Sequence, residues 1–145
     1  MKAMVIQRIA PVQDGSPPLQ LVEMPEPEPA AGEIRIRVHA CGVCHTELDE
    51  IEGRTPPPRL PMVPGHEVVG RVDKLGPGVR RFRGGERVGV GWIHSSSGAP
   101  DENLSPEFRA TGRDVNGGYA ELMTAPEAYV ISMTSMSATR LSSTG

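Results

Sequence analysis

Long apolar runs and a strong excess of either charge are both missing from this 145-residue sequence. Its first ten residues contain two basic side chains and no sustained apolar stretch, which predicts neither a signal peptide nor a membrane span. The 15 basic and 18 acidic residues give a net charge of -3, too small and too mixed to favour nucleic acid or an anionic membrane as partner. We therefore expect a cytoplasmic protein with one compact domain.

Cysteine is also scarce, because Cys41 and Cys44 are the only two in the chain. Without an export signal, cysteines act more often as metal ligands or reactive thiols than as a disulfide. The pattern Cys41-x-x-Cys44-His45 suits covalent haem attachment, half of a zinc finger, a thiol redox pair or a catalytic metal site. Haem attachment is disfavoured because it normally follows export, and a redox pair because it normally opens a helix in a βαβ unit.

Glycine and proline are abundant, and 17 Gly with 15 Pro divide the chain into the short segments typical of an all-β protein. Strict alternation over residues 33–39 places Ile34, Ile36 and Val38 on one buried face of a strand. The remaining predictions are a strand pair at 2–8 and 19–23, strands at 66–75, 86–92 and 117–122, a polar loop at 95–116, and a short helix at 46–51 capped by Thr46. Together they predict a barrel-like sheet with the cysteine motif at a strand-to-helix junction.

A second motif, PGHEVVG at residues 64–70, places His66 beside Glu67 at the start of an apolar strand. Imidazole and thiolate are ligands that zinc prefers, so Cys44 and His66 with a third ligand would leave one tetrahedral position for water or substrate. Glu67 would approach the metal or orient a ligand. A lone histidine is more often structural, so the prediction of a metal site depends on the two motifs together.

Three segments occur in an order that indicates a known protein family: GVCHTEL at 42–48, PGHEVVG at 64–70 and GERVGVGW at 85–92. Over residues 1–130 the chain resembles the N-terminal, GroES-like catalytic domain of the zinc-dependent alcohol dehydrogenases, in the medium-chain dehydrogenase/reductase family. The resemblance implies a mainly β fold, a partly open GroES-like β-barrel with short helices. It also implies oxidation of a small alcohol to an aldehyde or ketone by hydride transfer to NAD or NADP.

The resemblance assigns the metal ligands residue by residue. Cys44 and His66 match the first two ligands of the catalytic zinc, and Glu67 matches an alternate or near ligand. Cys41 matches a position that is not a ligand, which favours a buried, inert thiol. Glu47 stands where the family more usually has the Asp that orients the zinc-bound histidine, and this predicts an altered contact.

The resemblance also implies catalytic and binding roles for three more residues. Thr46 would pass the proton of the substrate alcohol, while His45 would lie toward the cofactor phosphates or the end of the proton relay. Helix capping explains Thr46 equally well. Trp92 would line the substrate pocket, although core packing is at least as good an explanation for a single Trp.

Departures from the family pattern concern both of its zinc ions. Residues 93–112 contain no cysteine where many relatives bind a structural zinc, so we predict none here. No cysteine follows Cys44, so the third thiolate ligand of the catalytic zinc is missing as well. Water, Glu67 or a group from another chain would have to replace it with lower affinity, which predicts partial zinc occupancy.

The cofactor side is missing too, because no Gly-x-Gly-x-x-Gly follows a strand and the Rossmann domain is therefore absent. We interpret the chain as a truncated catalytic domain, residues 1–130, followed by a weakly ordered polar tail, 131–145. Alone it should be weak or inactive, since hydride transfer needs a bound nicotinamide. A non-catalytic GroES-like module that binds metal or protein partners is the alternative. Apolar surface left without its cofactor domain predicts a homo-oligomer.

Overall fold

The computed structural model of the chain describes residues 1–12 and 17–133. These residues form a mainly β fold with one α-helix, as predicted, and none of their helices is long and apolar enough to cross a membrane. The elements in chain order are β1 (Lys2–Val5), β2 (Gln20–Glu23), β3 (Glu33–Cys41), α1 (His45–Glu52), β4 (Val68–Leu75), β5 (Arg87–Val90), β6 (Ile93–Ser95), η1 (Glu102–Leu104), β7 (Arg109–Ala110), β8 (Leu122–Pro126), η2 (Glu127–Tyr129) and β9 (Val130–Ser132).

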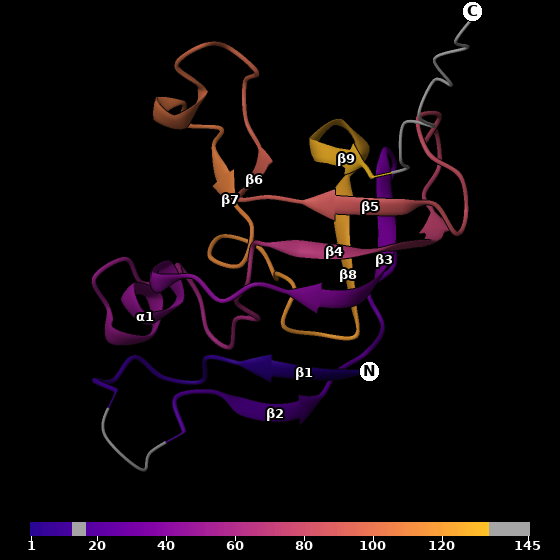
Figure 1. The fold of residues 1–145 in the computed structure, drawn as a ribbon. Coiled ribbons are helices and arrows are strands. Elements are labelled where there is room, and N and C mark those ends of the chain that lie inside the picture. The colour runs from indigo at the N-terminus through magenta and orange to yellow at the C-terminus, as the bar shows by residue number, and fades with distance from the viewer. Residues whose placement is uncertain (13–16, 134–145) are drawn as a thin grey trace, which may run out of the picture.

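The central sheet is antiparallel and orders its five strands as β8-β3-β4-β5-β9. Strand β3 pairs with β4 on one side and with β8 on the other. Its register with β4 shifts at Arg35/Ile36 and again at Val38/Ala40, and such bulges bend a strand and increase its twist. The sheet therefore curls into an open half-barrel, and Figure 1 shows β8 crossing steeply behind β4 and β5.

Two smaller sheets flank the curled one. The predicted pair β1 and β2 is confirmed, and β6 pairs with β7 at the base of a lobe that projects away from the central sheet (Figure 1). This lobe corrects one prediction, because the segment 95–116 contains η1 and β7 and is not irregular throughout. At the other end of the chain, β9 continues to Ser132, past the predicted domain boundary at 130. The rest of the predicted tail, 134–145, lies outside the described residues.

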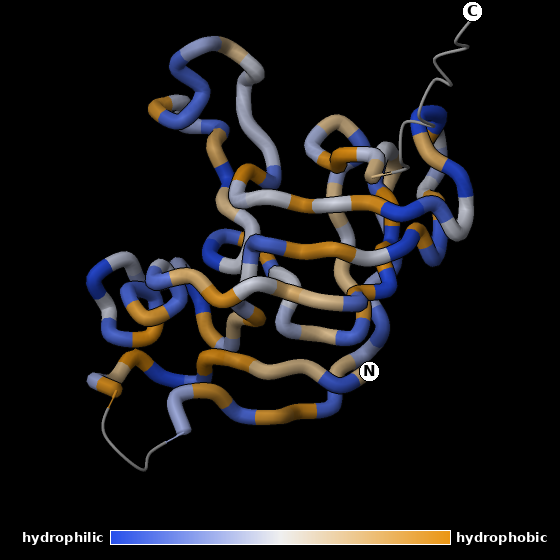
Figure 2. Tube along the Cα trace, in the orientation of Figure 1, coloured by the Kyte–Doolittle hydropathy of each residue, from blue (hydrophilic) through white to orange (hydrophobic). Residues whose placement is uncertain are grey.

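Alternation along β3 separates the core from the surface as its sequence predicts for Ile34 and Ile36, whereas Val38 is only half-buried. Ile34 and Ile36 are fully buried, whereas Arg35 and Arg37 donate hydrogen bonds to Asp73 of β4, at 2.6 and 3.0 Å. Figure 2 shows hydrophobic stretches in β4 and β5, which contribute to the same core. The buried cluster consists of Ile34, Ile36, Val68, Val72, Phe82, Val88, Val90, Met123, Ala125 and Val130.

The strand predicted at 117–122 is wrong, because the strand in this region, β8, begins only at Leu122. Residues before it bond to a loop instead: the N–H groups of Gly117 and Gly118 donate to the carbonyls of Val63 and Gly65, at 2.7 and 2.9 Å. A Cβ added to Gly117 would lie 2.1 Å from the Gly65 oxygen. Two backbones thus pass each other closely, immediately before His66.

We predict that Gly117→Ala lowers the free energy of unfolding by about 1–3 kcal/mol, because the new methyl group would overlap the Gly65 carbonyl. Urea unfolding followed by circular dichroism measures the change. Gly84→Ala is the matched control, since nothing lies within 4 Å of a Cβ at that position. Equal losses of stability in both variants would contradict the close-packing explanation.

Candidate metal centre

Helix α1 begins beside the first cysteine motif, and its start corrects the predicted cap. The helix begins at His45, with Cys44 rather than Thr46 as N-cap residue in extended backbone. The Cys44 N–H donates a 2.7 Å hydrogen bond to Glu47 Oε2, so the carboxylate three residues later satisfies this free donor. This bond ties the backbone of Cys44 to the first turn of α1.

The second motif enters the site from the loop before β4. Gly65 has φ 98, a left-handed conformation that favours glycine, and it precedes His66. The Gly42 N–H donates to the Glu67 carbonyl at 2.9 Å, which joins this loop to the end of β3. A Cβ on Gly42 would lie 2.1 Å from Glu67 Oε2, so glycine at this position leaves room for the carboxylate.

These two segments bring three potential metal ligands together. One ligand atom each from Cys44, His66 and Glu67 lies within 4.8 Å of the others. Cys44 is half-buried, His66 is 6% exposed and Glu67 is exposed, so the group opens toward solvent on one side. A thiol, an imidazole and a carboxylate form a donor set that suits zinc. The residues present therefore fit a catalytic type of zinc site.

Glu47 contacts the imidazole of His66 despite being one methylene longer than the usual Asp. Its Oε1 lies 3.0 Å from His66 Nδ1, although the two atoms are not aligned as a hydrogen bond. Both side chains are buried. Because Glu47 occupies the Nδ1 side of the ring, Nε2 remains for a metal. The contact predicted to be altered is thus a close approach of the two side chains without hydrogen-bond alignment.

Three further predicted residues surround this cluster. Thr46 Oγ1 lies 3.5 Å from Cys44 Sγ, so the hydroxyl adjoins a predicted ligand. The His45 side chain is 77% exposed, and its Nε2 is 3.7 Å from Asp49 Oδ1. Trp92 is 41% exposed and meets the His66 ring edge-on at 6.1 Å, which places it beside the cluster rather than inside the core.

Two neighbouring groups stay protonated near neutral pH. Burial raises the pKa of the Cys41 thiol, in keeping with an inert side chain. Burial also raises the pKa of Tyr119 to about 12, and the negative charge of Glu47 adds to this effect. The Tyr119 hydroxyl donates to the Gly42 carbonyl at 3.4 Å.

Sequence reasoning missed Glu50, a buried carboxyl on α1. Glu50 is fully buried, and neither carboxylate oxygen has a hydrogen-bond partner within the described part of the chain. Burial raises its pKa to about 8, the charge of Glu47 acts in the same direction, and Arg113 opposes them. The spacing of Glu47, Glu50 and Ile51, which marks one face of a helix, was the available signal.

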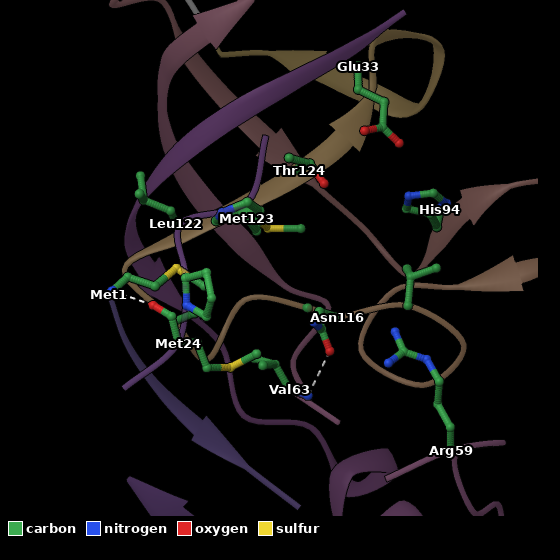
Figure 3. A pocket seen from close by; sticks show the side chains of 15 residues that line it. Met1, Met24, Glu33, Arg59, Val63, His94, Asn116, Leu122, Met123 and Thr124 are labelled. Carbon is green, nitrogen blue, oxygen red and sulfur yellow. Dashed lines mark hydrogen bonds between the residues drawn. The ribbon is translucent and has the colours of Figure 1, made fainter. Parts of the chain in front are cut away.

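A separate cavity of about 270 Å³ lies elsewhere in the molecule, next to β8 (Figure 3). Met24, Glu33 and His94 are among the residues that line it, and none of the predicted metal ligands does. Burial lowers the pKa of His94, so its imidazole is neutral at neutral pH. This cavity is therefore distinct from the metal-ligand cluster.

Comparison with known proteins identifies the family. Residues 30–135 match the alcohol dehydrogenase GroES-like domain. The chain belongs to this family. An alcohol dehydrogenase of Geobacillus stearothermophilus is 40% identical over 138 residues, and the probable alcohol dehydrogenase AdhA of Mycobacterium tuberculosis is 42% identical over 140. These alignments cover 90% and 89% of this chain but only 39% and 40% of the relatives, so the GroES-like chain spans about two fifths of their length.

Solved structures confirm the GroES-like fold. The crystal structure of an NAD-dependent alcohol dehydrogenase superimposes with a TM-score of 0.80 at 30% identity, over 91% of this chain and 39% of that one. A cobalt- and zinc-bound thermostable alcohol dehydrogenase from Pyrobaculum aerophilum gives a TM-score of 0.81 at 25% identity, over 93% and 42%. The predicted resemblance to the alcohol dehydrogenases is therefore correct.

Glu50 should make the stability of this GroES-like domain depend on pH. Its folded pKa of about 8 lies above the ordinary 4.5, so its stabilising contribution is complete below pH 4.5 and is lost as the pH rises to 8. We expect wild-type stability to fall relative to Glu50→Gln over this window, by on the order of 1 kcal/mol per pH unit.

Urea unfolding between pH 5 and pH 9 measures this difference. Glu52→Gln is the matched control, because hydrogen bonding to the Val12 N–H lowers the pKa of Glu52 and its charge is constant over that range. A wild-type curve parallel to that of Glu50→Gln would contradict the prediction.

Proposed function

We propose that this chain is the catalytic domain of a zinc-dependent alcohol dehydrogenase, which oxidises small alcohols to aldehydes or ketones with NAD or NADP as hydride acceptor. One observation carries the proposal: Cys44, His66 and Glu67 converge within 4.8 Å in a GroES-like fold. Relatives at 40% and 42% identity with the name alcohol dehydrogenase support it. A zinc ion bound to these residues would supply Lewis-acid chemistry toward an alcohol oxygen.

The residues of the cluster have different roles in binding the ion. Cys44 and His66 are the principal ligands, and Glu47 fixes the imidazole by its contact with Nδ1. Glu67 serves as a third ligand or stands next to the ion, because no cysteine follows Cys44 in the sequence. A carboxylate in place of a thiolate is a weaker ligand for zinc, which favours partial occupancy. We propose no structural zinc, since residues 93–112 lack cysteine.

The remaining predicted residues handle the proton and the substrate. Thr46, whose hydroxyl adjoins Cys44 Sγ, would relay the proton: it would accept the proton of the alcohol as it donates its own hydroxyl proton onward, toward His45 or solvent. His45 is exposed, so it can release a proton to solvent or contact the phosphates of the cofactor. Trp92, beside the His66 ring, forms a wall of the substrate pocket.

These 145 residues contain no Gly-x-Gly-x-x-Gly after a strand, so we assign no nicotinamide-binding motif to them. We propose that residues 1–130 form the catalytic domain and that the 145-residue chain alone turns over alcohol weakly. We further propose a cytoplasmic homo-oligomer. Ile131 (66% exposed) and Met133 (41%) line one surface hollow with Val69 and Val90, and this apolar patch supports self-association.

Zinc affinity tests the ligand assignment. We expect Cys44→Ser and His66→Ala each to weaken zinc binding by about 100-fold or more, because the loss of a direct ligand exceeds the typical effect of its supporting residues. Competition with a chromophoric chelator measures the dissociation constants. Cys41→Ser is the matched control and should bind zinc like the wild type. An equal loss in Cys41→Ser would show that the cluster is assigned incorrectly.

Substrate binding separates a dehydrogenase domain from a non-catalytic metal-binding module. We expect benzyl alcohol to shift the visible absorption band of the cobalt-loaded chain, because an alcohol oxygen would enter the position left open by the protein ligands. Thr46→Ala should require a several-fold higher alcohol concentration, since the hydroxyl that accepts the alcohol proton is removed. A cobalt band that is unchanged by alcohol would support the non-catalytic module.

A further inference from the structure

Glu50 is enclosed by groups that favour its neutral form. It is fully buried, and its two oxygens have no partner among the described residues. Glu47 and Asp49 on its own helix and Asp114 from the loop after β7 act on it as negative charges. Among the residues that the structure describes, Arg113 from the same loop is the cation that opposes this effect, and its Nε lies 3.8 Å from Asp114 Oδ1. The carboxyl therefore holds its proton at neutral pH.

Glu50 is connected to the metal-ligand cluster through Glu47. It follows Glu47 by three residues on α1, a spacing that makes two helical side chains neighbours. Glu47 in turn contacts His66 through Oε1 and the Cys44 backbone through Oε2. Glu50 in the protein interior therefore neighbours Glu47, and Glu47 contacts the proposed ligands.

A divalent cation would change the balance of charge around this helix. Bound at Cys44, His66 and Glu67, it would add two positive charges to a region where carboxylates outnumber cations. A nearby positive charge favours the ionised form of a carboxyl. The thiol of Cys44 must also lose its proton to become a ligand.

We propose that Glu50 stores a proton in the metal-free protein and releases it when a divalent cation binds at Cys44, His66 and Glu67. The carboxylic acid becomes a carboxylate and its proton passes to solvent, as does the proton of the Cys44 thiol. The two new negative charges balance the two positive charges of the ion. This inference rests on the metal site of the proposed function and extends it, because it makes metal uptake depend on the protonation of a residue that is not a ligand.

Proton counting by isothermal titration calorimetry tests the proposal. Zinc chloride is titrated into the metal-free chain at pH 7 in buffers with different ionisation enthalpies, which gives the number of protons released per zinc. We expect the wild type to release close to one more proton than Glu50→Gln. Glu52→Gln is the control on the same helix and should match the wild type, because Glu52 is already ionised. Equal proton counts in wild type and Glu50→Gln would overturn the proposal.

The pH dependence of zinc affinity provides a second readout. The ratio of the wild-type and Glu50→Gln dissociation constants should change by up to about tenfold per pH unit below pH 8 and be constant above it. Deprotonation of Cys44 occurs in both proteins, so it cancels in this ratio. A ratio that is constant from pH 6 to pH 9 would overturn the proposal.

If Glu50→Gln does not fold, the proposal can still be tested on the wild type, by carbon-13 NMR of its glutamate carboxyl groups. One glutamate carboxyl carbon should titrate near pH 8 in the metal-free chain and at lower pH with zinc bound. A midpoint that zinc does not move would overturn the proposal but leave the proposed function standing. No heat and no spectral change on adding zinc to any of the proteins would overturn both.

Discussion

The close approach of two backbones, without side chains between them, is the constraint on which the candidate metal centre depends. Gly117 and Gly118 bond to the carbonyls of the loop before His66, and no room remains there for a Cβ. This contact fixes where β4 begins and therefore where His66 and Glu67 stand relative to the end of β3. The curled sheet is the rigid part of the fold. The two glycines determine how closely the segment 64–70 approaches the end of β3.

Charged side chains on one face of α1 also help to position the candidate site. The Glu47 carboxylate contacts both the Cys44 backbone and the His66 ring, and so joins the two ligand-bearing segments through a single buried group. A carboxylate so placed is costly to bury unless its partners are fixed. The neutral state of Glu50 reduces that cost, because a second negative charge would otherwise repel Glu47 from one helical turn away.

Local patterns predicted the parts of the structure that local interactions determine. The alternation of Ile34 and Ile36 with polar residues predicted strand β3. The two short motifs predicted that Cys44, His66 and Glu67 would lie close together, and they do. Tertiary contacts overrode the rest. Gly117 lies in a loop rather than a strand because its N–H bonds to Val63. No single-sequence pattern shows that the carboxyl of Glu50 has no hydrogen-bond partner among the residues the structure describes, since this depends on what packs against α1.

The proposed ligands Cys44 and His66 lie 22 positions apart in the sequence, on either side of α1 and a proline-rich connection. An ion held by both would bind the folded chain and be lost from the unfolded one, because the unfolded chain does not hold the two groups together. Its binding would therefore add to the free energy of unfolding, by about 2.7 kcal/mol when the free ion is at 100 times its dissociation constant. An ion bound at this site would therefore stabilise the folded state in addition to any catalytic role. The segment between its two ligands, which contains α1, is the part whose position it would fix.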